Sequence, residues 1–209
     1  EVYGVSGNGE DGRGAAMEKT LPGFHYRVAD VSNEPEISAL LGRIGQLDAA
    51  FNNAGTGIAP QKLPEADIAR ARRVIDVNLV GTLICMKHEI AHMPGSGVVV
   101  NNASLAAFKA ATGADMSYSA SKAGVLALTA EAAANPEFAG RVSFFSIAPG
   151  YIETRMTAAD DKEAQKRRLP SRRLGQPAEV AALVYKIITN HYAFTSGQCF
   201  NFDGGAFLI

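Results

Sequence analysis

The segment Gly97-Val-Val-Val-Asn-Asn-Ala-Ser104, followed 14 residues after its serine by Tyr118-Ser-Ala-Ser-Lys122, decides how this chain folds. An apolar run that begins at a glycine predicts a buried strand, and this run stops at the hydroxyl of Ser104. Small apolar residues with helical spacing fill 120–134, so a helix is expected there. A strand followed by a helix of this length is the unit from which parallel sheets are built.

Tyr118 and Lys122 lie four residues apart, which places them on the same face of a helix. The lysine ammonium then favours the phenolate and lowers the pKa of the phenol from its ordinary value near ~10. A phenol tuned in this way exchanges protons closer to neutral pH, and Ser104 is placed to hold a substrate oxygen nearby. The alternative is an ordinary surface pair at the start of a helix. The Tyr-x-x-x-Lys pattern alone does not decide between the two.

Composition places the chain among ordinary globular proteins. It has 209 residues, 47% of them hydrophobic and 20% charged, with a net charge of -1, which suits one domain over residues 1–209. A net charge near zero gives no reason to expect nucleic acid or an anionic membrane as partner. We also expect no membrane span and no leader. Cys85 and Cys199 lack metal-ligand spacing, so we expect buried thiols, no metal site and a cytoplasmic location.

Strand and helix patterns alternate along the whole chain. This alternation predicts parallel pairing in a doubly wound α/β sheet. In such sheets ligands bind beyond the carboxyl ends of the strands, where Asn52, Ser104 and Pro149 fall. The strands are expected at 2–6, 24–31, 47–51, 97–101, 141–147 and 197–202, and the helices at 15–21, 32–44, 66–92, 120–134 and 177–190.

The stretch 7–14 matches the pattern Gly-x-Gly-x-x-Gly of dinucleotide-binding loops. Glu10 and Asp11 place two carboxylates within it, and like charge opposes a bound pyrophosphate. We therefore interpret this stretch as a strand-to-helix turn.

Several ordered motifs together resemble the short-chain dehydrogenase/reductase family over essentially the whole chain. The resemblance implies a Rossmann-like α/β/α fold of three layers. It rests on Asp30-Val31, Asn52-Asn53-Ala54-Gly55, Asn78, Ser104, Tyr118-Ser-Ala-Ser-Lys122, Pro149-Gly150-Tyr-Ile152-Glu-Thr154, Arg173-Leu-Gly175-Gln-Pro177 and Asp203-Gly204-Gly205.

The resemblance implies four catalytic roles. Tyr118 is the general acid or base that exchanges a proton with the substrate oxygen. Lys122 lowers the tyrosine pKa and binds the nicotinamide ribose, while Ser104 binds the substrate oxygen and orients its carbon. Asn78 holds a water that links Lys122 to solvent. A polar residue that satisfies a bent helix backbone explains Asn78 equally well.

The resemblance also implies contacts to the adenosine half of a cofactor. Asp30 accepts a hydrogen bond from the adenine amino group beside the backbone of Val31, or else it caps the following turn. Asn52, Ala54 and Gly55 bring the backbone close to the adenosine ribose, because the last two lack bulk. Asn52 alternatively clasps the strand end without touching a ligand.

Around the nicotinamide, the resemblance implies contacts from Tyr118 and Lys122 and from the segment after the strand at 141–147. Residues 153–173, which are polar and weakly periodic, are interpreted as a mobile lid over the substrate. The nicotinamide contacts expected after the strand at 141–147 are Pro149, Gly150, Ile152 and Thr154, with Thr154 near the carboxamide or the phosphates.

One family motif has no counterpart in this sequence. The family carries a Thr-Gly-x-x-x-Gly-x-Gly loop after its first strand, and the spacing to Asn52 makes residues 2–6 correspond to the second strand. We therefore expect the first strand and helix to be missing and two inner strand edges to be unpaired. Positions 6–8 carry no basic pair for a phosphate, which favours NAD over NADP, although Arg13 lies close by.

These observations predict an NAD(P)-dependent oxidoreductase that interconverts an alcohol and a carbonyl compound. One alternative is a truncated, non-catalytic protein of the same fold that acts as a binding or scaffold module. Another is an epimerase or dehydratase, although such relatives carry a larger substrate domain. Apolar helix faces after Asn78 and Lys122, together with the resemblance, predict a homodimer or homotetramer with a small-molecule substrate.

Overall fold

The structure is a computed structural model that describes residues 1–7, 12–109, 114–158, 161–190 and 195–208. Strands and helices alternate as the sequence predicts. The strands are β1 (Val2–Ser6), β2 (Phe24–Val28), β3 (Ala49–Asn52), β4 (Gly97–Asn102), β5 (Val142–Pro149) and β6 (Cys199–Phe202). The α-helices are α1 (Arg13–Thr20), α2 (Glu34–Ile44), α3 (Ile68–Ile75), α4 (Gly81–Ala91), α5 (Met116–Ala134), α6 (Lys162–Arg168) and α7 (Pro177–Thr189).

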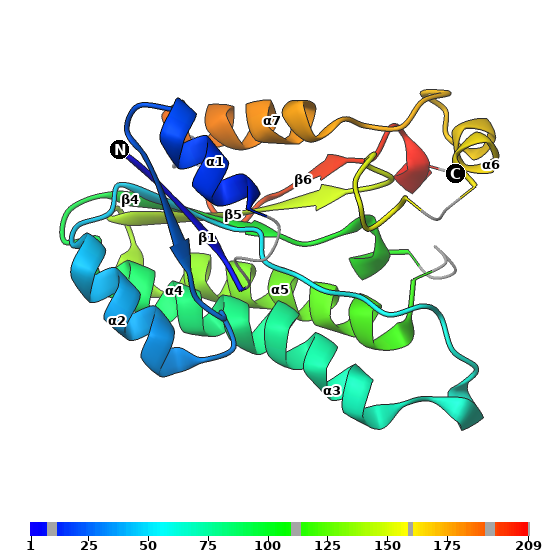
Figure 1. Ribbon diagram of the computed structural model, residues 1–209, viewed down its shortest axis with the longest axis horizontal. Helices are drawn as coiled ribbons and strands as arrows, with labels where there is room; N and C mark the ends of the chain where they lie inside the picture. Colours follow the sequence, from blue (N-terminus) through cyan, green and yellow to red (C-terminus); the bar gives the residue numbers. More distant parts are fainter. Residues whose placement is uncertain (8–11, 110–113, 159–160, 191–194, 209) are drawn as a thin grey trace.

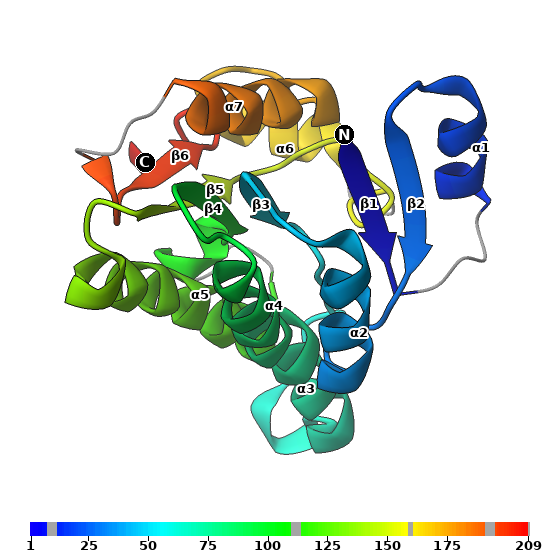
Figure 2. The ribbon, with the colours of Figure 1, turned by 90° about the vertical axis from the view of Figure 1, so that its left-hand side faces the viewer.

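All strand pairs are parallel, which confirms the doubly wound α/β fold. The helices α4 and α5 lie on one side of the sheet formed by β3 to β6, and α7 lies on the other (Figures 1 and 2). The strands form two separate sheets, one of β1 and β2 and one in the order β3-β4-β5-β6. Among the described residues, β1 pairs only with β2 and β3 only with β4, so the two unpaired edges expected from the sequence are present.

The hydrophobic core surrounds β4 and β5. Because side chains alternate across a strand, Val99 and Phe144 point toward α4 and α5, where Met86 and Met93 are buried. Val100 and Phe145 point the other way and pack against α7. The two central strands are therefore covered on both faces, and their carboxyl ends are held in fixed positions.

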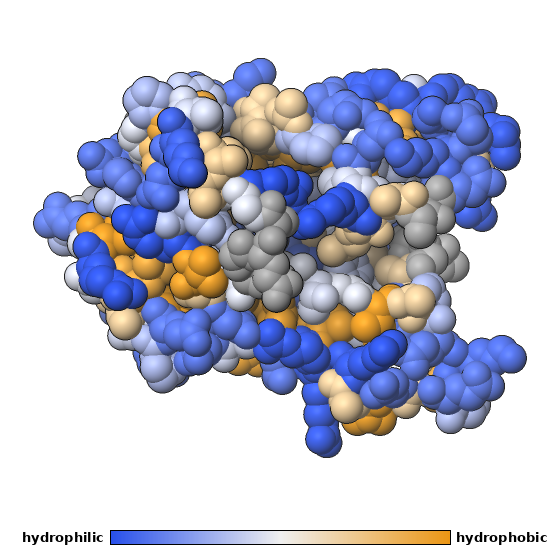
Figure 3. All heavy atoms as spheres, in the orientation of Figure 1, coloured by the Kyte–Doolittle hydropathy of each residue, from blue (hydrophilic) through white to orange (hydrophobic). Residues whose placement is uncertain are grey.

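The unit formed by β1, α1 and β2 has almost no core. The described residues of α1 include no buried one, and several large apolar side chains of the unit are exposed. Apolar surface is visible beside β1 and β2 (Figure 3). The exposed side chains are Val2, Val5, Met17, Leu21 and Val28.

Three expected elements differ from the structure. The helix predicted at 66–92 is interrupted by a π-helical turn at Asp76–Val80, which contains Asn78. The strand predicted at 24–31 ends at Val28, because Asp30 bonds the backbone and hydroxyl of Ser32 and turns the chain. The segment 153–173 contains the helix α6, and the buried Leu169 follows it. Residues 8–11 of the Gly-rich stretch lie outside the described residues.

The two thiols are free. Burial raises the pKa of the Cys85 thiol on α4 to about 12, with a smaller contribution from Glu89. Cys199 is half-buried at the start of β6. Among the helices that the structure describes, none has the length and apolar character needed to cross a membrane.

Candidate active site

Ser104, Tyr118 and Lys122 converge at the carboxyl end of β4. Ser104 ends the strand segment and caps a short 3-10 helix, Leu105–Ala107, by accepting a hydrogen bond from Ala106 N. Tyr118 and Lys122 lie in the first two turns of α5, and the Ser104 hydroxyl is close enough to the Tyr118 phenol to lower its pKa. The Lys122 Nζ lies 5.8 Å from the centre of the Tyr118 ring. The strand-end serine and the i,i+4 pair therefore meet as the sequence predicts.

The expected effect on the Tyr118 pKa is wrong in direction. Burial raises the pKa of the phenol above its ordinary value, and the hydrogen bond from Ser104 only partly opposes this. Burial also lowers the pKa of Lys122 to about 8, since a desolvated ammonium loses its charge more readily. Tyr118 is therefore a neutral phenol at neutral pH.

Asn78 joins three parts of the site and is fully buried. Its Oδ1 accepts a hydrogen bond from Thr56 N at 2.8 Å, and its Nδ2 donates to Thr56 O and to Ser121 Oγ. Its backbone oxygen accepts from Thr82 Oγ1, within the π-helical turn. A Cβ placed on Gly55 would lie 3.4 Å from both Asn78 Oδ1 and Lys122 Nζ. Asn78 thus holds the loop after β3 against the lysine.

Asn52 points away from this loop and into the protein. Its Nδ2 donates to Glu89 Oε2 at 3.0 Å and to Asn101 Oδ1 at 2.9 Å. Asn101 in turn donates to Thr129 Oγ1. Burial raises the pKa of Glu89 to about 7, although the bond from Asn52 opposes the rise. The side-chain nitrogen of Asn52 therefore makes the strand-end clasp, which is one of its two interpretations.

Asp30 lies on the turn after β2 and is already hydrogen-bonded. Its Oδ1 accepts from Ser32 N and Oγ, and its Oδ2 accepts from Arg73 Nη2 at 2.7 Å. The bonds from Ser32 and then Arg73 hold the pKa of this carboxyl at about 2. Val31 packs against the start of α4, so closely that a Cβ on Gly81 would lie 2.8 Å from its Cγ2.

The segment after β5 is fixed by the last motif of the chain. Gly150 N donates to Phe202 O, and a Cβ on Gly150 would lie 2.9 Å from the Asp203 Cα. Ile152 forms a β-bridge to Gly175. The exposed Thr154 donates its backbone N–H to Thr157 Oγ1. The Pro149–Gly150 turn is therefore clamped, whereas Thr154 lies farther out.

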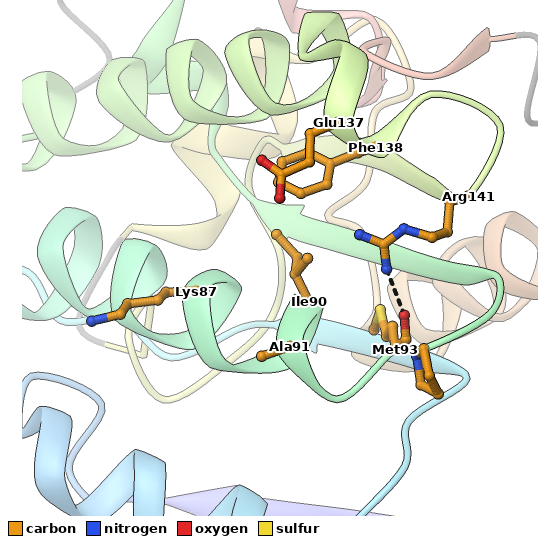
Figure 4. Close-up of a pocket in the computed structure, with 8 residues that line it drawn as sticks. Lys87, Ile90, Ala91, Met93, Glu137, Phe138 and Arg141 are labelled. Atoms are coloured by element: carbon orange, nitrogen blue, oxygen red, sulfur yellow. Dashed lines mark hydrogen bonds between the residues drawn. The ribbon is translucent and has the colours of Figure 1, made fainter.

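Two cavities are lined entirely by residues that the structure describes, and the larger of these two is not at this site. A cavity of about 410 Å³ lies at the amino ends of β4 and β5 (Figure 4), where Arg141 donates to Met93 O and faces the ring of Phe138. The smaller, of about 130 Å³, lies beside Ile152 and Gly204 at the carboxyl ends of β5 and β6. The smaller cavity is therefore the one next to the predicted ligand edge.

Sequence reasoning missed several residues that shape the site. Asp115 caps α5 by accepting from Ser117 N, and an aspartate three residues before Tyr118 was a usable signal that the helix begins earlier than residue 120. Ser121 accepts from Asn78 and donates to the backbone of Tyr118. Asn102 accepts from Lys122 Nζ at 2.7 Å through its backbone oxygen. Nothing in the sequence patterns distinguishes these last two from ordinary strand and helix residues.

The residues near Lys122 fit a hydroxylated nucleotide ribose. Gly55 leaves open the space beside Asn78 and Lys122, and the lysine offers donors there. The Oδ1 of Asn102 is buried and has no partner among the described residues. The donors of Lys122 and the open acceptor of Asn102 are each groups that suit a hydroxyl, which both accepts and donates.

Comparisons with known proteins show what this chain is similar to. Residues 4–206 match the family model described as enoyl-(acyl carrier protein) reductase. A cis-4-hydroxycyclohexanecarboxylate dehydrogenase of Sinomonas cyclohexanicum is 36% identical over 185 residues, covering 84% of this chain and 74% of the relative. Levodione reductase superposes with a TM-score of 0.88 at 28% identity, over 100% of this chain and 88% of the other. A 3-oxoacyl-[acyl-carrier protein] reductase with bound NAD from Brucella melitensis has a TM-score of 0.88 at 26% identity, over 100% and 82%.

Proposed function

Since this chain belongs to the short-chain dehydrogenase/reductase family and is an oxidoreductase that acts on CH–OH groups, we propose that Tyr118 is its proton donor. The reaction is the interconversion of a secondary alcohol and a ketone with a nicotinamide cofactor. The observation that carries the proposal is the half-buried Tyr118 phenol, whose pKa is influenced by Ser104 and whose ring lies beside Lys122.

The chemistry of reduction follows from these groups. When bound, the reduced nicotinamide supplies a hydride to the carbonyl carbon. Ser104 binds the carbonyl oxygen, and Tyr118 transfers its phenolic proton to that oxygen as the C=O bond becomes a C–O–H group. The phenol is protonated at neutral pH, as its role as proton donor in ketone reduction requires.

Lys122 and Asn78 have supporting roles in this proposal. With its pKa lowered to about 8, Lys122 holds its proton at pH 7 and releases it readily, as a group in a proton relay must. Its ammonium also stabilises the phenolate that forms on Tyr118 after proton transfer. Asn78 orients the loop at Thr56 and keeps the space beside Lys122 open.

The cofactor contacts follow the carboxyl edge of the strands. Asp30 and Val31 receive the adenine, and the backbone of Asn52, Ala54 and Gly55 lines the ribose, while the Asn52 side chain is held by Glu89. Around the nicotinamide we place Pro149, Gly150, Ile152 and Thr154. We favour NAD over NADP because positions 6–8 carry no basic pair.

We propose alicyclic alcohols and ketones as the first substrates to assay, because one relative is named for cis-4-hydroxycyclohexanecarboxylate. We propose that residues 153–173 cover the substrate, since the nearby cavity of about 130 Å³ is lined in part by Leu169 and Ser171. We also propose a cytoplasmic homodimer or homotetramer that associates through α4, α5 and the π-helical turn before α4, where Leu83 and Val80 are exposed. Analytical ultracentrifugation tests this assembly, and a monomer at micromolar concentration contradicts it.

The test is the rate of 4-oxocyclohexanecarboxylate reduction by wild type and Tyr118→Phe. Removing the proton donor is expected to lower kcat by at least about 100-fold while the Kd for NADH stays within about 3-fold. Tyr185→Phe, on the exposed face of α7, is the matched control and keeps full activity. Near-normal turnover by Tyr118→Phe contradicts the assignment. If wild type binds neither NADH nor NADPH at millimolar concentration, the scaffold alternative replaces the enzyme.

A further inference from the structure

The larger of the two cavities, of about 410 Å³, has no part in the reaction proposed for Tyr118. It lies at the amino ends of β4 and β5, whereas Ser104 and Pro149 lie at the carboxyl ends of these strands. Its walls come from the end of α4 and from the segment between α5 and β5 (Figure 4). Pockets that bind small molecules typically have roughly 300 to 1,000 Å³, so this space is large enough for one.

The floor of the cavity is apolar and belongs to the hydrophobic core. Met93 is fully buried, and Ile90 and Phe138 are partly buried in the same cluster as Phe144. The ring centre of Phe138 lies 5.6 Å from that of Phe144. An apolar ring or short chain placed here leaves water for a surface whose side chains the core already holds in position.

Arg141 gives the cavity a fixed positive charge. The half-buried side chain donates from Nη1 to Met93 O at 2.7 Å, and its guanidinium carbon lies 5.8 Å from the centre of the Phe138 ring. No carboxylate in the described parts of the chain forms an ion pair with it. A guanidinium presents its N–H donors as a planar fork that fits a carboxylate. The bond to Met93 therefore orients Arg141 and leaves the other donors for a ligand.

The two other charged residues of the cavity act differently. Lys87 forms an ion pair with Glu34 of α2 at 2.6 Å, and its ammonium is directed away from Arg141 (Figure 4). Glu137 is exposed, and its carboxylate is turned toward Ile90, as the guanidinium of Arg141 is. An anion bound by Arg141 is therefore repelled by Glu137 and gains little from Lys87.

We propose that this cavity is a second ligand site, which binds a small free carboxylate that carries an apolar ring or a short apolar chain. Arg141 binds the carboxylate, and the apolar body packs on Ile90, Met93 and Phe138. Glu137 weakens the binding through like charge. The inference goes beyond the proposed function and does not depend on it, because the cavity and Tyr118 lie at opposite ends of the sheet.

The test uses cyclohexanecarboxylate as the ligand and protein with ¹³C-labelled methionine methyl groups. We expect the signal of Met93, which Met93→Leu identifies, to move with saturation while the signals of Met116 and Met156 stay unchanged. The last two side chains are exposed, at the start of α5 and in the segment 153–173, and they report on the candidate active site. Cyclohexanemethanol has the same ring without the charge, and its Kd should be at least about 10-fold higher.

Three variants test the roles of the lining residues. Arg141→Gln can still donate to Met93 O but carries no charge, so the Kd for cyclohexanecarboxylate should rise at least about 10-fold. Glu137→Gln removes the repulsion and should lower the Kd about 2- to 3-fold. Ala91→Phe fills the cavity from α4 and should abolish the response of Met93 to the ligand. Glu131→Gln, on the exposed face of α5, makes the same charge change away from the cavity and is the control for Glu137→Gln.

Each other outcome overturns the inference. A response of Met116 or Met156 in place of Met93 assigns the carboxylate to the candidate active site and leaves the proposed function intact. Equal binding of cyclohexanemethanol contradicts the carboxylate class. Glu137→Gln and Ala91→Phe leave Arg141 unchanged, so they decide the matter even if Arg141→Gln fails to fold. Unchanged binding by Ala91→Phe, or weaker binding by Glu137→Gln than by Glu131→Gln, contradicts the proposed site.

Discussion

The two separate sheets of this molecule place the same residue types in opposite environments. Around β4 and β5, Phe144 and Ile147 are fully buried and Glu89 is enclosed in the protein. In the unit of β1, α1 and β2, Val28 is 56% exposed and Glu18 is at the surface, where backbone and side-chain groups of Tyr26 and Arg27 surround it. Burial raises the pKa of Glu89, whereas hydrogen bonds lower the pKa of Glu18.

The comparison shows which part of the sheet can support catalysis. A proton donor with a raised pKa requires exclusion from water, and only the sheet with helices on both faces provides this. The smaller sheet holds its shape mainly through parallel backbone pairing and surface ion pairs such as Arg27 with Glu18. Ion pairs at the surface contribute little, so this unit depends on its connection to the rest.

The largest expected difference between the two sheets is the stability lost when an apolar side chain is truncated. Phe144→Ala removes a fully buried ring between β4, β5 and α5, and we expect a loss of about 3 to 5 kcal/mol. Val28→Ala should cost less than about 0.5 kcal/mol, because the side chain is mostly in solvent. Urea denaturation measures both, and similar losses would show that the two sheets are equally well packed.

Removing the hydroxyl of Ser104 tests whether the sheet that contains β4 carries the proposed catalytic site. Ser104→Ala should lower kcat by about 100-fold, since it deletes a hydrogen bond to the reacting oxygen. It should also raise the Tyr118 pKa further, because the bond from Ser104 lowers that pKa. Steady-state kinetics across pH 6 to 9 measures the first effect. Ser38→Ala, at an exposed position of α2, is the surface comparison and should leave kcat within about 2-fold.

The two glutamates give a pH-dependent version of the comparison. The folded-state pKa of Glu89 is about 7, above its ordinary value of 4.5. The folded protein therefore binds the extra proton, and the stability contributed by this group is present below pH 4.5 and lost as pH rises through 7. Glu89→Gln should remove that loss, making the variant about 2 to 3 kcal/mol more stable than wild type at pH 8 but not at pH 4.5.

Thermal unfolding at the two pH values measures this effect. Glu18→Gln is the matched control from the exposed unit and should change the melting temperature little at either pH. A Glu89→Gln variant that is no more stable than wild type at pH 8 would contradict the raised pKa.

The sequence could predict what depends on local pattern. Period and length placed the strands, and the strand-end rule together with the i,i+4 rule brought Ser104, Tyr118 and Lys122 to one place. The unpaired edges of β1 and β3 followed from counting family motifs. These inferences need no knowledge of the tertiary contacts between helices and strands.

What the sequence could not give depends on burial and on distant partners. The raised pKa of Tyr118 follows from how completely α5 and its surroundings exclude water, which no four-residue spacing encodes. Asn52 turns inward because Glu89, 37 residues away, meets it there. The π-helical turn at Asn78 depends on Thr56, on a loop 22 residues earlier in the chain.

The central claim is that Tyr118 is a half-buried, neutral phenol able to donate a proton. The most direct measurement is the chemical shift of the tyrosine Cζ atoms in ¹³C-labelled protein between pH 7 and 9, with Tyr118→Phe identifying the signal. We expect the Tyr118 signal to keep the shift of a protonated phenol throughout, because burial raises its pKa above 10. A signal that moves to the phenolate position below pH 9 would contradict the account.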